Sequence, residues 1–423
     1  MSEQIIIIGG GIAGLYAAKK LSAEKKHVIL LEARDRLGGR IHTIISNNGA
    51  SIEMEYGAEF VHGELPITLG LLKEYGISYY KTTGEMYDLT KTKSSEHDDA
   101  KWNSLLQAMV ELKSDIALSD FLNKFFSGKK NNSLRNAAEK YASGFDLADP
   151  EIASSMALYR EWSAESELQF RIEGGYKKLI DALHNDCLKM GCNIYTSSIV
   201  KEIEWSKNDV KIILSSGKSF TGNKALITIP AGVWQDGVAN KGFIHFKPAI
   251  TQKIDLFRHI GFGSVIKLFL VFKFPFWISQ YENAAFFFTP NSIPTWWTQE
   301  PKKNNLLTGW LGGIEAKKWN KKSDDEILHA AIDSLASSFN QGITNLKEIL
   351  ISSKIINWEN EIFTKGGYSF SALDTSNARM QLCDPIENTL FFAGEALHNG
   401  IMQGTVEAAL HSAFDSLLKM IST

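Results

Sequence analysis

Residues 5–21 read IIIIGGGIAGLYAAKKL and join an apolar strand, a glycine-rich turn and a helix. The run of four isoleucines predicts a buried strand, and the apolar residues after the turn repeat at helical spacing. Between the two, Gly9, Gly11 and Gly14 form the pattern G-x-G-x-x-G. Gly9 allows a tight turn, Gly11 lets the backbone approach a pyrophosphate, and Gly14 lets the helix pack closely on the strand. The segment therefore predicts a dinucleotide site at a helix N-terminus.

An acidic residue completes this pattern. A second predicted strand, HVILL, ends at Glu32, which lies about 20 residues after the glycines, where an acceptor for ribose hydroxyls is expected. A glutamate at this place repels a 2′-phosphate and disfavours NADP. The alternative is a glycine-rich structural turn, which would not require Glu32.

Composition bounds the remaining possibilities. The chain has 423 residues, which predicts two domains, and a net charge of −3, which argues against a nucleic-acid partner. Its three cysteines are too few for a disulfide framework and suit a reducing cytoplasm. No cysteine and histidine spacing indicates a zinc site, and no apolar run reaches the roughly 20 residues of a membrane span. We therefore expect a cytoplasmic protein with neither a metal nor a membrane-spanning segment.

The order of predicted elements indicates a discontinuous fold. A strand–helix–strand unit comes first, and a helical stretch follows over about 100–165 with a helix start at Asp149. A three-stranded meander is predicted over 199–230 and an amphipathic helix over 324–339, before a last strand–helix pair. We expect a mixed α/β protein with a Rossmann-like nucleotide domain and a substrate domain of mixed sheet and helices. The expected segments are 1–75, 170–250 and 355–423 for the nucleotide domain and 76–169 and 251–354 for the substrate domain.

One lysine conflicts with the apolar pattern around it. Lys267 lies in GSVIKLFLVF, residues 263–272, which is apolar on both faces and reads as an interior strand. Burial of an unpaired ammonium costs several kcal/mol or more. Lys267 either extends to a strand end and reaches water or serves a chemical need in the interior, and the strand alone leaves both alternatives open.

The residues after the second strand resemble a known family. EARDRLGGRIHT, residues 32–43, resembles the E-x-R-x-x-x-G-G-R run of the flavin-containing amine oxidase family, of the monoamine and polyamine oxidase type. The resemblance implies FAD as cofactor, with Gly39 and Arg40 along the pyrophosphate and Arg34 near the adenosine end. Arg36 reads as a solvated surface residue.

A second resemblance to the same family lies near the C-terminus, in FFAGE and NGIMQGTVEAALHSA. It implies that Glu395 lies by the ribityl–phosphate chain, that the Met402 N–H contacts the flavin ring, and that Val200 contacts the adenine through its backbone. A surface or helix-capping acid is the alternative for Glu395. The expected cofactor-binding residues are Gly9, Gly11, Ile12, Ala13, Gly14, Glu32, Ala33, Arg34, Gly39, Arg40, Gly57, Ala58, Val200, Trp358, Gly394, Glu395, Met402 and Thr405.

The resemblance also gives Lys267 a context. Residues 261–277 resemble the family segment whose lysine holds a water against the hydride-accepting nitrogen of the flavin. Residues 356–370 resemble its substrate-side loop, in which Tyr368 would face the flavin, so Lys267 and Tyr368 are the expected catalytic residues. Monoamine oxidases carry a cysteine that bonds to the flavin where this chain has Gly367, which implies non-covalent FAD. They carry a second slot tyrosine where this chain has Ile401, and a tryptophan from elsewhere could replace it.

The expected substrate pocket contains His62, Ile401, Trp296 and Trp297. GAEFVHG, residues 57–63, is similar to the G-A-x-W-x-H-G segment of polyamine oxidases and favours such substrates, although His62 could equally be a structural histidine. The acids that could hold a second ammonium, or lie at the surface, are Glu59, Glu64, Glu167 and Glu173. No insertion of coiled-coil length exists, which argues against a chromatin-demethylase arrangement.

Together these features predict a FAD-dependent amine oxidase that forms an imine, hydrolysed to an aldehyde or ketone, while dioxygen becomes hydrogen peroxide. A flavin desaturase or porphyrinogen-type oxidase is one alternative and has no need of Lys267 or Tyr368. An L-amino-acid oxidase is another and needs an arginine facing the substrate carboxylate. A flavin-binding protein without turnover is the third. The arginines considered for the carboxylate are Arg160, Arg171, Arg258 and Arg379.

Overall fold

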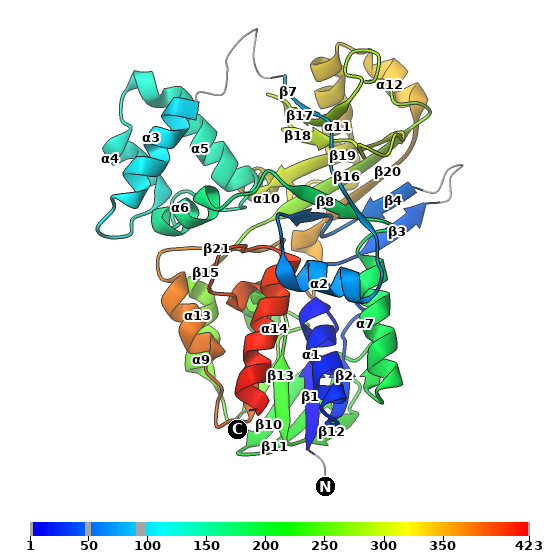
Figure 1. Cartoon of the computed structure of the whole chain (residues 1–423), viewed down its shortest axis with the longest axis vertical. Helices are drawn as coiled ribbons and strands as arrows, with labels where there is room; N and C mark the ends of the chain where they lie inside the picture. Colours follow the sequence, from blue (N-terminus) through cyan, green and yellow to red (C-terminus); the bar gives the residue numbers. More distant parts are fainter. Residues whose placement is uncertain (1–2, 47–51, 90–98, 422–423) are drawn as a thin grey trace.

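A computed structural model describes residues 3–46, 52–89 and 99–421 (Figure 1). Figure 1 shows both chain ends at the end of the molecule that contains β1, β13, α1 and α14. The opposite end contains β16, β19, α11 and α12, and a separate group of helices, α3–α6, lies to one side.

The first sheet is parallel and has the order β22-β13-β1-β2-β9. Most of its residues are buried, as in a parallel sheet covered on both faces. Its strands come from distant parts of the chain, so the expected α/β fold with a Rossmann-like part built from separated segments is confirmed. The strands are β1 (Gln4–Ile8), β2 (His27–Leu31), β9 (Asn193–Tyr195), β13 (Lys224–Ile227) and β22 (Leu390–Phe392).

Helices cover one face of this sheet. α1 (Ile12–Ala23) packs between α7 (Lys177–Lys189) and α14 (Val406–Ile421), and their apolar side chains share a core with β1 and β2. α2 (Pro66–Glu74) is fixed to α14 by Glu407, whose buried carboxylate accepts hydrogen bonds from the N–H groups of Ile67 at 2.8 Å and Thr68 at 2.7 Å. These N–H groups belong to the first turn of α2, where they lack helical partners.

The predicted meander over 199–230 is partly wrong. β10 (Val200–Ser206), β11 (Asp209–Leu214) and β12 (Ser219–Gly222) form consecutive antiparallel pairs, and β14 (His245–Lys247) pairs parallel with β10. The segment KALI, expected as the third strand, is β13 and lies between β1 and β22 instead. All four of its residues are buried, which suits the middle of a covered parallel sheet and not the edge of a meander.

The second large sheet has the order β20-β16-β19-β18-β17-β7. β16 (Val265–Phe272) carries Lys267, is buried at every residue and has partners on both sides, as the sequence predicted. α11 (Asp324–Phe339) begins with a capping box at Ser323 and matches the predicted range. The other elements of this part are β7 (Glu85–Asp88), β17 (Ala284–Phe288), β18 (Thr295–Trp297), β19 (Leu306–Gly312), β20 (Leu350–Asn357), α10 (Gly313–Trp319) and α12 (Ile343–Ile349).

Four helices enclose a smaller core beside this sheet, and the helix start predicted at Asp149 is wrong. α6 begins six residues later, capped by Ser154, whose hydroxyl accepts from the N–H of Ala157. Asp149 instead closes a turn, because its carboxylate accepts from the N–H of Glu151 at 3.1 Å. The helices are α3 (Asp99–Val110), α4 (Leu118–Phe125), α5 (Asn132–Gly144) and α6 (Ser155–Ser163).

Smaller elements connect these parts. Among the described residues, no helix is long and apolar enough to cross a membrane, and no cluster of His, Cys, Asp and Glu could hold a metal ion. The longest described helices, α11 and α14, have 16 residues, so no coiled-coil insertion occurs among them. The remaining strands and α-helices are β3 (Thr43–Ser46), β4 (Ile52–Glu55), β5 (Phe60–His62), β6 (Tyr79–Lys81), β8 (Gln169–Ile172), β15 (Ile260–Phe262), β21 (Ser369–Ser371), α8 (Ala231–Asp236), α9 (Thr251–Asp255) and α13 (Thr375–Cys383).

Candidate active site

One cavity of about 2400 Å³ extends from the turn between β1 and α1 to the strand that carries Lys267. Ligand sites for small molecules are commonly roughly 300–1,000 Å³, so this space has room for a dinucleotide and a second molecule. Its wall includes residues of both large sheets and of the α5–α6 helices. The expected cofactor end and the expected substrate end therefore belong to a single continuous space.

The glycine turn has the geometry that a pyrophosphate site needs. Gly9 has a φ of 110°, and an added Cβ at Gly14 would overlap the carbonyl oxygen of Gly9. At Gly11, by contrast, no atom lies within 4 Å of an added Cβ, because this residue faces the cavity. Gly11 has an extended backbone at the N-terminus of α1, where no side chain caps the helix and no acid lies in the first turn. A helix N-terminus without a side-chain cap and an open approach favour an anion here.

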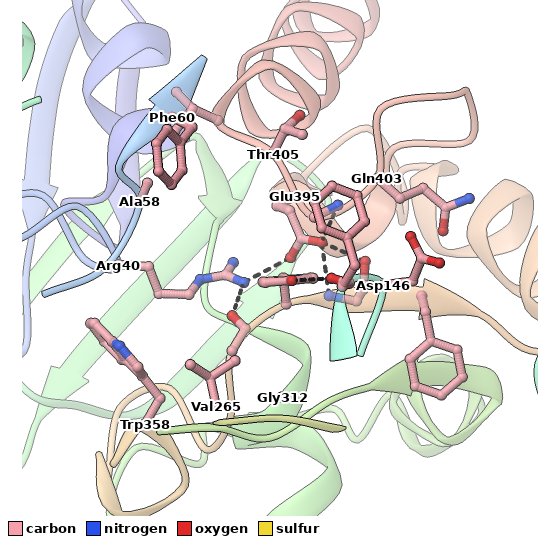
Figure 2. A pocket seen from close by; sticks show the side chains of 18 of the residues that line it. Arg40, Ala58, Phe60, Asp146, Val265, Gly312, Trp358, Glu395, Gln403 and Thr405 are labelled. Carbon is pink, nitrogen blue, oxygen red and sulfur yellow. Dashed lines mark hydrogen bonds and ion pairs between the residues drawn. The ribbon is translucent and has the colours of Figure 1, made fainter. Parts of the chain in front are cut away.

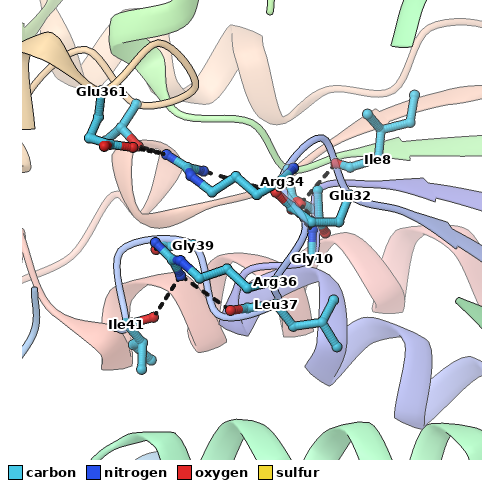
Figure 3. A network of polar contacts seen from close by, with 12 residues as sticks. Ile8, Gly10, Glu32, Arg34, Arg36, Leu37, Gly39, Ile41 and Glu361 are labelled. Atoms are coloured by element: carbon cyan, nitrogen blue, oxygen red, sulfur yellow. Dashed lines mark hydrogen bonds and ion pairs between the residues drawn. The ribbon is translucent and has the colours of Figure 1, made fainter. Parts of the chain in front are cut away.

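Glu32 is fixed beside this turn (Figure 3). One carboxylate oxygen accepts from the N–H of Gly10 at 2.6 Å and the other from the N–H of Arg34 at 2.9 Å. The Arg34 guanidinium donates to Thr364 Oγ1 at 2.7 Å and to Glu361 at 3.2 Å. Glu32 and Arg34 line the cavity together with Val200 on β10, and their contact with an adenosine stays a prediction.

Arg36 was predicted as a solvated surface residue, and the structure contradicts this. Its guanidinium donates to the carbonyl oxygens of Gly39 at 3.0 Å and of Leu37 and Ile41 at 3.3 Å (Figure 3). Burial lowers the pKa of Arg36. Arg36 therefore holds the loop in which Gly39 lines the cavity. No local sequence pattern distinguishes this arginine from a solvated one.

Arg40 and Glu395 meet in the middle of the cavity wall (Figure 2). Arg40 Nη1 donates to Glu395 at 2.8 Å and to the carbonyl oxygen of Gly367 at 2.8 Å. The other Glu395 oxygen accepts from the N–H groups of Ser369 at 2.9 Å and Gly404 at 3.2 Å. Burial alone would raise the pKa of Glu395, but the Arg40 guanidinium and the Ser369 contacts lower it below its usual value. Glu395 is 4% exposed, so the surface alternative is excluded.

In the loop before α14, the Met402 N–H that was expected to contact the flavin ring has a protein partner instead. Met402 lines the cavity, but its N–H donates to the carboxylate of Glu161 at 3.0 Å, and Gln403 Nε2 donates to the same carboxylate at 3.0 Å. A contact between this N–H and a flavin ring stays a prediction and would compete with Glu161. Thr405 Oγ1 accepts from the N–H of Ala408 at 3.1 Å and so supports the first turn of α14.

Lys267 is buried and paired. It is 2% exposed, so the alternative in which it reaches water at a strand end is wrong. Its ammonium donates to Glu59 at 2.8 Å and to the carbonyl oxygens of Glu55 at 2.6 Å and Gly57 at 3.2 Å. These partners explain how the fold tolerates the charge, and Lys267 still lines the cavity.

Aromatic rings surround Lys267. Trp310 lies opposite Lys267 on the neighbouring strand β19, and its ring is stacked on that of Tyr368 with centroids 6.5 Å apart and planes 24° apart. Trp297 packs beside Trp310 with ring centroids 5.9 Å apart, and the rings of Trp297, Trp310 and Tyr368 all line the cavity. Trp296, also expected in the pocket, does not line the cavity: it is fully buried in the core behind β18, because neighbouring residues of a strand face opposite sides.

His62 and Ile401 both line the cavity. Burial lowers the pKa of His62 to about 4, so the ring is neutral near pH 7. It packs edge-on against Phe145 with centroids 5.8 Å apart. Ile401 is 40% exposed and leaves one side of the expected slot without an aromatic ring. Trp310 is the tryptophan that could take this part.

Acids form one wall of the cavity. Asp146 lies after α5, and its carboxylate accepts from Trp162 Nε1 at 2.8 Å, while burial, together with Glu161 and Glu165, raises its pKa to about 8. No local sequence pattern marks these three acids, which only the fold brings together. Of the four acids considered, Glu59, Glu64 and Glu167 line the cavity, and Glu59 pairs with Lys267 there. Glu173 does not line it and pairs with Lys302.

The arginines considered for a substrate carboxylate lie elsewhere. Among the described residues that line the cavity, the arginines are Arg34 and Arg40, both on the nucleotide side. Arg379 is buried and donates to the carbonyl oxygen of Ala396 and to two serine hydroxyls. Arg171 donates to Glu59, and Arg160 and Arg258 are exposed.

The residues fit a bound FAD. The open backbone at Gly11, the fixed carboxylate of Glu32 and the Arg40–Glu395 pair all line the same cavity. No cysteine lies among the described residues that line it. The structure thus offers no thiol for a covalent bond to the flavin.

Comparisons with known proteins agree with this arrangement. A family model described as flavin containing amine oxidoreductase matches residues 12–415. The chain is 27% identical to lysine-specific histone demethylase 2 of Homo sapiens, over 97% of this chain and 52% of that protein. It is 25% identical to polyamine oxidase 2 of Arabidopsis thaliana, over 99% of this chain and 89% of that protein. The chain thus spans about half the length of the demethylase that it matches.

Solved structures share the fold. A putrescine oxidase bound to putrescine superposes with a TM-score of 0.82 and 16% identity over the whole of both chains. Cyclohexylamine oxidase from Brevibacterium oxydans IH-35A gives a TM-score of 0.80 and 18% identity, also over the whole of both chains.

Proposed function

We propose that this chain, which belongs to the flavin containing amine oxidoreductase family, oxidises a polyamine or another primary or secondary amine. The chain binds FAD non-covalently. The amine loses two electrons and two protons to become an imine, which water hydrolyses to an aldehyde or ketone and a free amine. Dioxygen takes up the electrons and protons as hydrogen peroxide.

One observation carries the proposal. A single cavity joins the dinucleotide turn at Gly11 to a wall that contains Lys267, Tyr368 and a set of acids. Bound FAD supplies the redox chemistry by accepting a hydride equivalent from the α-carbon of the amine. The desaturase or porphyrinogen-type alternative gives no reason for Lys267 and Tyr368 to line that space. An amino-acid oxidase needs an arginine at the substrate end, and the described lining residues there include none.

The side chains of this cavity position the substrate. The rings of Tyr368 and Trp310 offer aromatic faces to an amine in either charge state, and the neutral His62 adds no competing charge. Asp146, Glu161 and Glu165 can pair with an ammonium at the other end of a longer substrate. We assign Lys267 to the reaction of the reduced cofactor with dioxygen, because a fixed cation stabilises negative charge as it develops.

The test is hydrogen peroxide release by the FAD-loaded protein with a panel of amines. The panel contains α,ω-diamines, triamines, monoamines of equal chain length, L-amino acids and a methyl-lysine peptide. We expect the diamines and triamines to give kcat/KM values at least about tenfold above those of the monoamines, the effect of one charge-assisted contact.

Each outcome decides between functions. If only the methyl-lysine peptide is turned over, the substrate is a peptide and not a small amine. If only L-amino acids are turned over, the protein is an amino-acid oxidase. A yellow protein that is inert to the whole panel would favour a flavin-binding protein without turnover.

A further inference from the structure

Glu59 connects three elements through one buried carboxylate. Its Oε2 accepts from Lys267 of β16 at 2.8 Å, and its Oε1 accepts from Arg171 of β8 at 3.0 Å and from Trp297 of β18 at 3.0 Å. The Glu59 side chain is 5% exposed, and the residue lines the cavity beside Lys267. Burial alone would raise the pKa of Glu59, but Lys267 and Arg171 lower it.

The contacts of Lys267 use all of its donors. An ammonium has three hydrogens, and Lys267 has three acceptors within 3.2 Å, namely Glu59 and two backbone carbonyls. The contact to the Gly57 carbonyl, at 3.2 Å, is the longest and the one that a water or ligand could replace at least cost. The carboxylate contact is charge-assisted and therefore fixes the position of the head group most strongly.

The charges of this cluster do not cancel. Lys267 and Arg171 share the single carboxylate of Glu59, which leaves one positive charge in excess while the neighbouring Glu55 carboxyl is protonated, below about pH 7. Glu55 is the other acid that faces Lys267, and its carboxyl accepts from Thr43 at 2.8 Å and from the N–H of Tyr176 at 2.6 Å, with its pKa raised by burial to about 7. The Arg171 guanidinium also lies 4.6 Å from the centre of the Phe60 ring.

We propose that Glu59 is a positioning residue that holds the Lys267 ammonium at the cavity wall, and that the carboxylate it shares with Arg171 keeps an excess positive charge there. The inference rests on the proposed function only in assigning Lys267 to the reacting end of the cofactor. The substrate role considered for Glu59 is set aside, because its oxygens already hold Lys267, Arg171 and Trp297.

The test is a double-variant cycle of Glu59→Gln and Lys267→Met. With Glu59→Gln alone, two cations lose their shared carboxylate; with Lys267→Met already present, only Arg171 loses it. The first readout is the denaturant midpoint of unfolding of the FAD-free proteins. We expect the double variant to lose less stability than the sum of the two single losses.

The second readout is reoxidation by dioxygen of the FAD-loaded proteins after chemical reduction, which needs no amine. We expect Glu59→Gln to slow reoxidation about tenfold in the native background and less than about twofold in the Lys267→Met background. Glu59→Asp, which keeps the charge, should restore part of the rate. Glu173→Gln is the matched control, since it removes an acid that pairs with Lys302 at the surface.

Additive losses in both readouts would overturn the inference, and so would a rate that Glu59→Gln leaves unchanged. Where Glu59→Gln does not fold, the same cycle with Glu59→Asp replaces it. Because neither readout uses an amine, an amine panel without turnover defeats the proposed function and leaves this test intact.

Discussion

At the scale of single residues, the missing side chain of Gly11 suits the binding of a ligand and is not needed for packing. An added Cβ at Gly11 meets no atom within 4 Å, whereas one at Gly14 would overlap the Gly9 carbonyl oxygen. Gly11 is therefore not required for packing of α1 on β1. Its missing side chain leaves space that faces the cavity and suits a closely approaching phosphate.

We expect Gly11→Ala to weaken FAD binding at least about tenfold, because the methyl group would occupy the approach of the pyrophosphate. The melting temperature of the FAD-free protein should stay nearly unchanged. Titration with FAD measures the affinity, and thermal unfolding measures the melting temperature. Gly70→Ala on α2, where an added Cβ also meets nothing, is the control and should keep its affinity for FAD. Equal affinity of Gly11→Ala and the native protein would contradict the assignment.

The proposed role of Lys267 can be tested directly by substitution. We expect Lys267→Met to slow reoxidation of the reduced flavin at least about tenfold, because a fixed cation is lost, while FAD stays bound. Glu59 would keep Arg171 and Trp297 as partners, so the variant should fold. The measurement is stopped-flow mixing with dioxygen, with the exposed Lys273→Met on the same segment as control. An unchanged rate would remove Lys267 from the reaction.

Part of this site could be predicted from single residues and part could not. Glu32, Arg40, Lys267 and Tyr368 were predicted because they lie in local patterns or match family segments, and all four line the cavity. Asp146 could not be predicted, because a lone aspartate in a helical stretch has no local pattern. It acquires meaning only when the α5–α6 connection is brought next to the aromatic residues.

At the scale of elements, the α5–α6 connection places a half-buried acid, Asp146, in the cavity wall where the ammonium of a substrate is expected. Burial, and then Glu161 and Glu165, raise the pKa of Asp146 from 3.8 to about 8, with one partner, Trp162 Nε1, acting in the opposite direction. Between those pH values the folded protein holds a proton that the unfolded chain has released. The contribution of Asp146 to stability therefore falls as pH rises from about 4 to about 8.

We expect Asp146→Asn to remove this fall. The FAD-free variant should gain stability relative to the native protein between about pH 5 and pH 8, and most of the gain should lie near pH 8. Denaturant unfolding at the two pH values measures the difference. Glu167→Gln, an exposed acid of the same wall, is the control and should keep the native slope. A difference between Asp146→Asn and the native protein that does not change with pH would contradict the account.

Elements with strong local signals were predicted well. Continuous apolar runs set β1, β2 and β16, helical apolar spacing sets α1, and helical spacing after the Ser323 cap sets α11. β13 was assigned to the wrong sheet, because its four apolar residues fit either sheet and only the pairing with β1 and β22 decides. Helix α6 was started too early, since Asp149 and Pro150 suit a turn as well as a helix start.

At the scale of the whole molecule, the two large sheets enclose one cavity with a nucleotide end and an acidic, aromatic end. The division of the chain into two discontinuous domains at the expected boundaries stays a prediction. The fold as a whole brings charged residues from distant parts of the chain to the wall of this cavity. Among the described lining residues, Arg40 and Lys267 are each paired with an acid, Glu395 and Glu59, whereas Asp146, Glu161 and Glu165 form a group of acids elsewhere in the wall.

This distribution predicts how turnover depends on pH. In the proposed reaction the amine reacts in its neutral form, and free amines have pKa values near 10.4, so kcat/KM should rise up to about tenfold per pH unit between about pH 6 and 9. Ionisation of Asp146, with its pKa of about 8, acts in the same direction for a substrate with a second ammonium. His62 stays neutral throughout, since its pKa is about 4. Steady-state rates at limiting amine measure the profile, and a flat profile would contradict a neutral amine as the reacting form.

The most direct test of the central claim is anaerobic mixing of the FAD-loaded protein with the amine panel, followed through the visible absorbance of the flavin. The account predicts that diamines or triamines bleach the flavin completely and that admitted dioxygen restores the colour with release of hydrogen peroxide. A flavin that stays yellow with every amine would contradict the claim that this cavity oxidises amines.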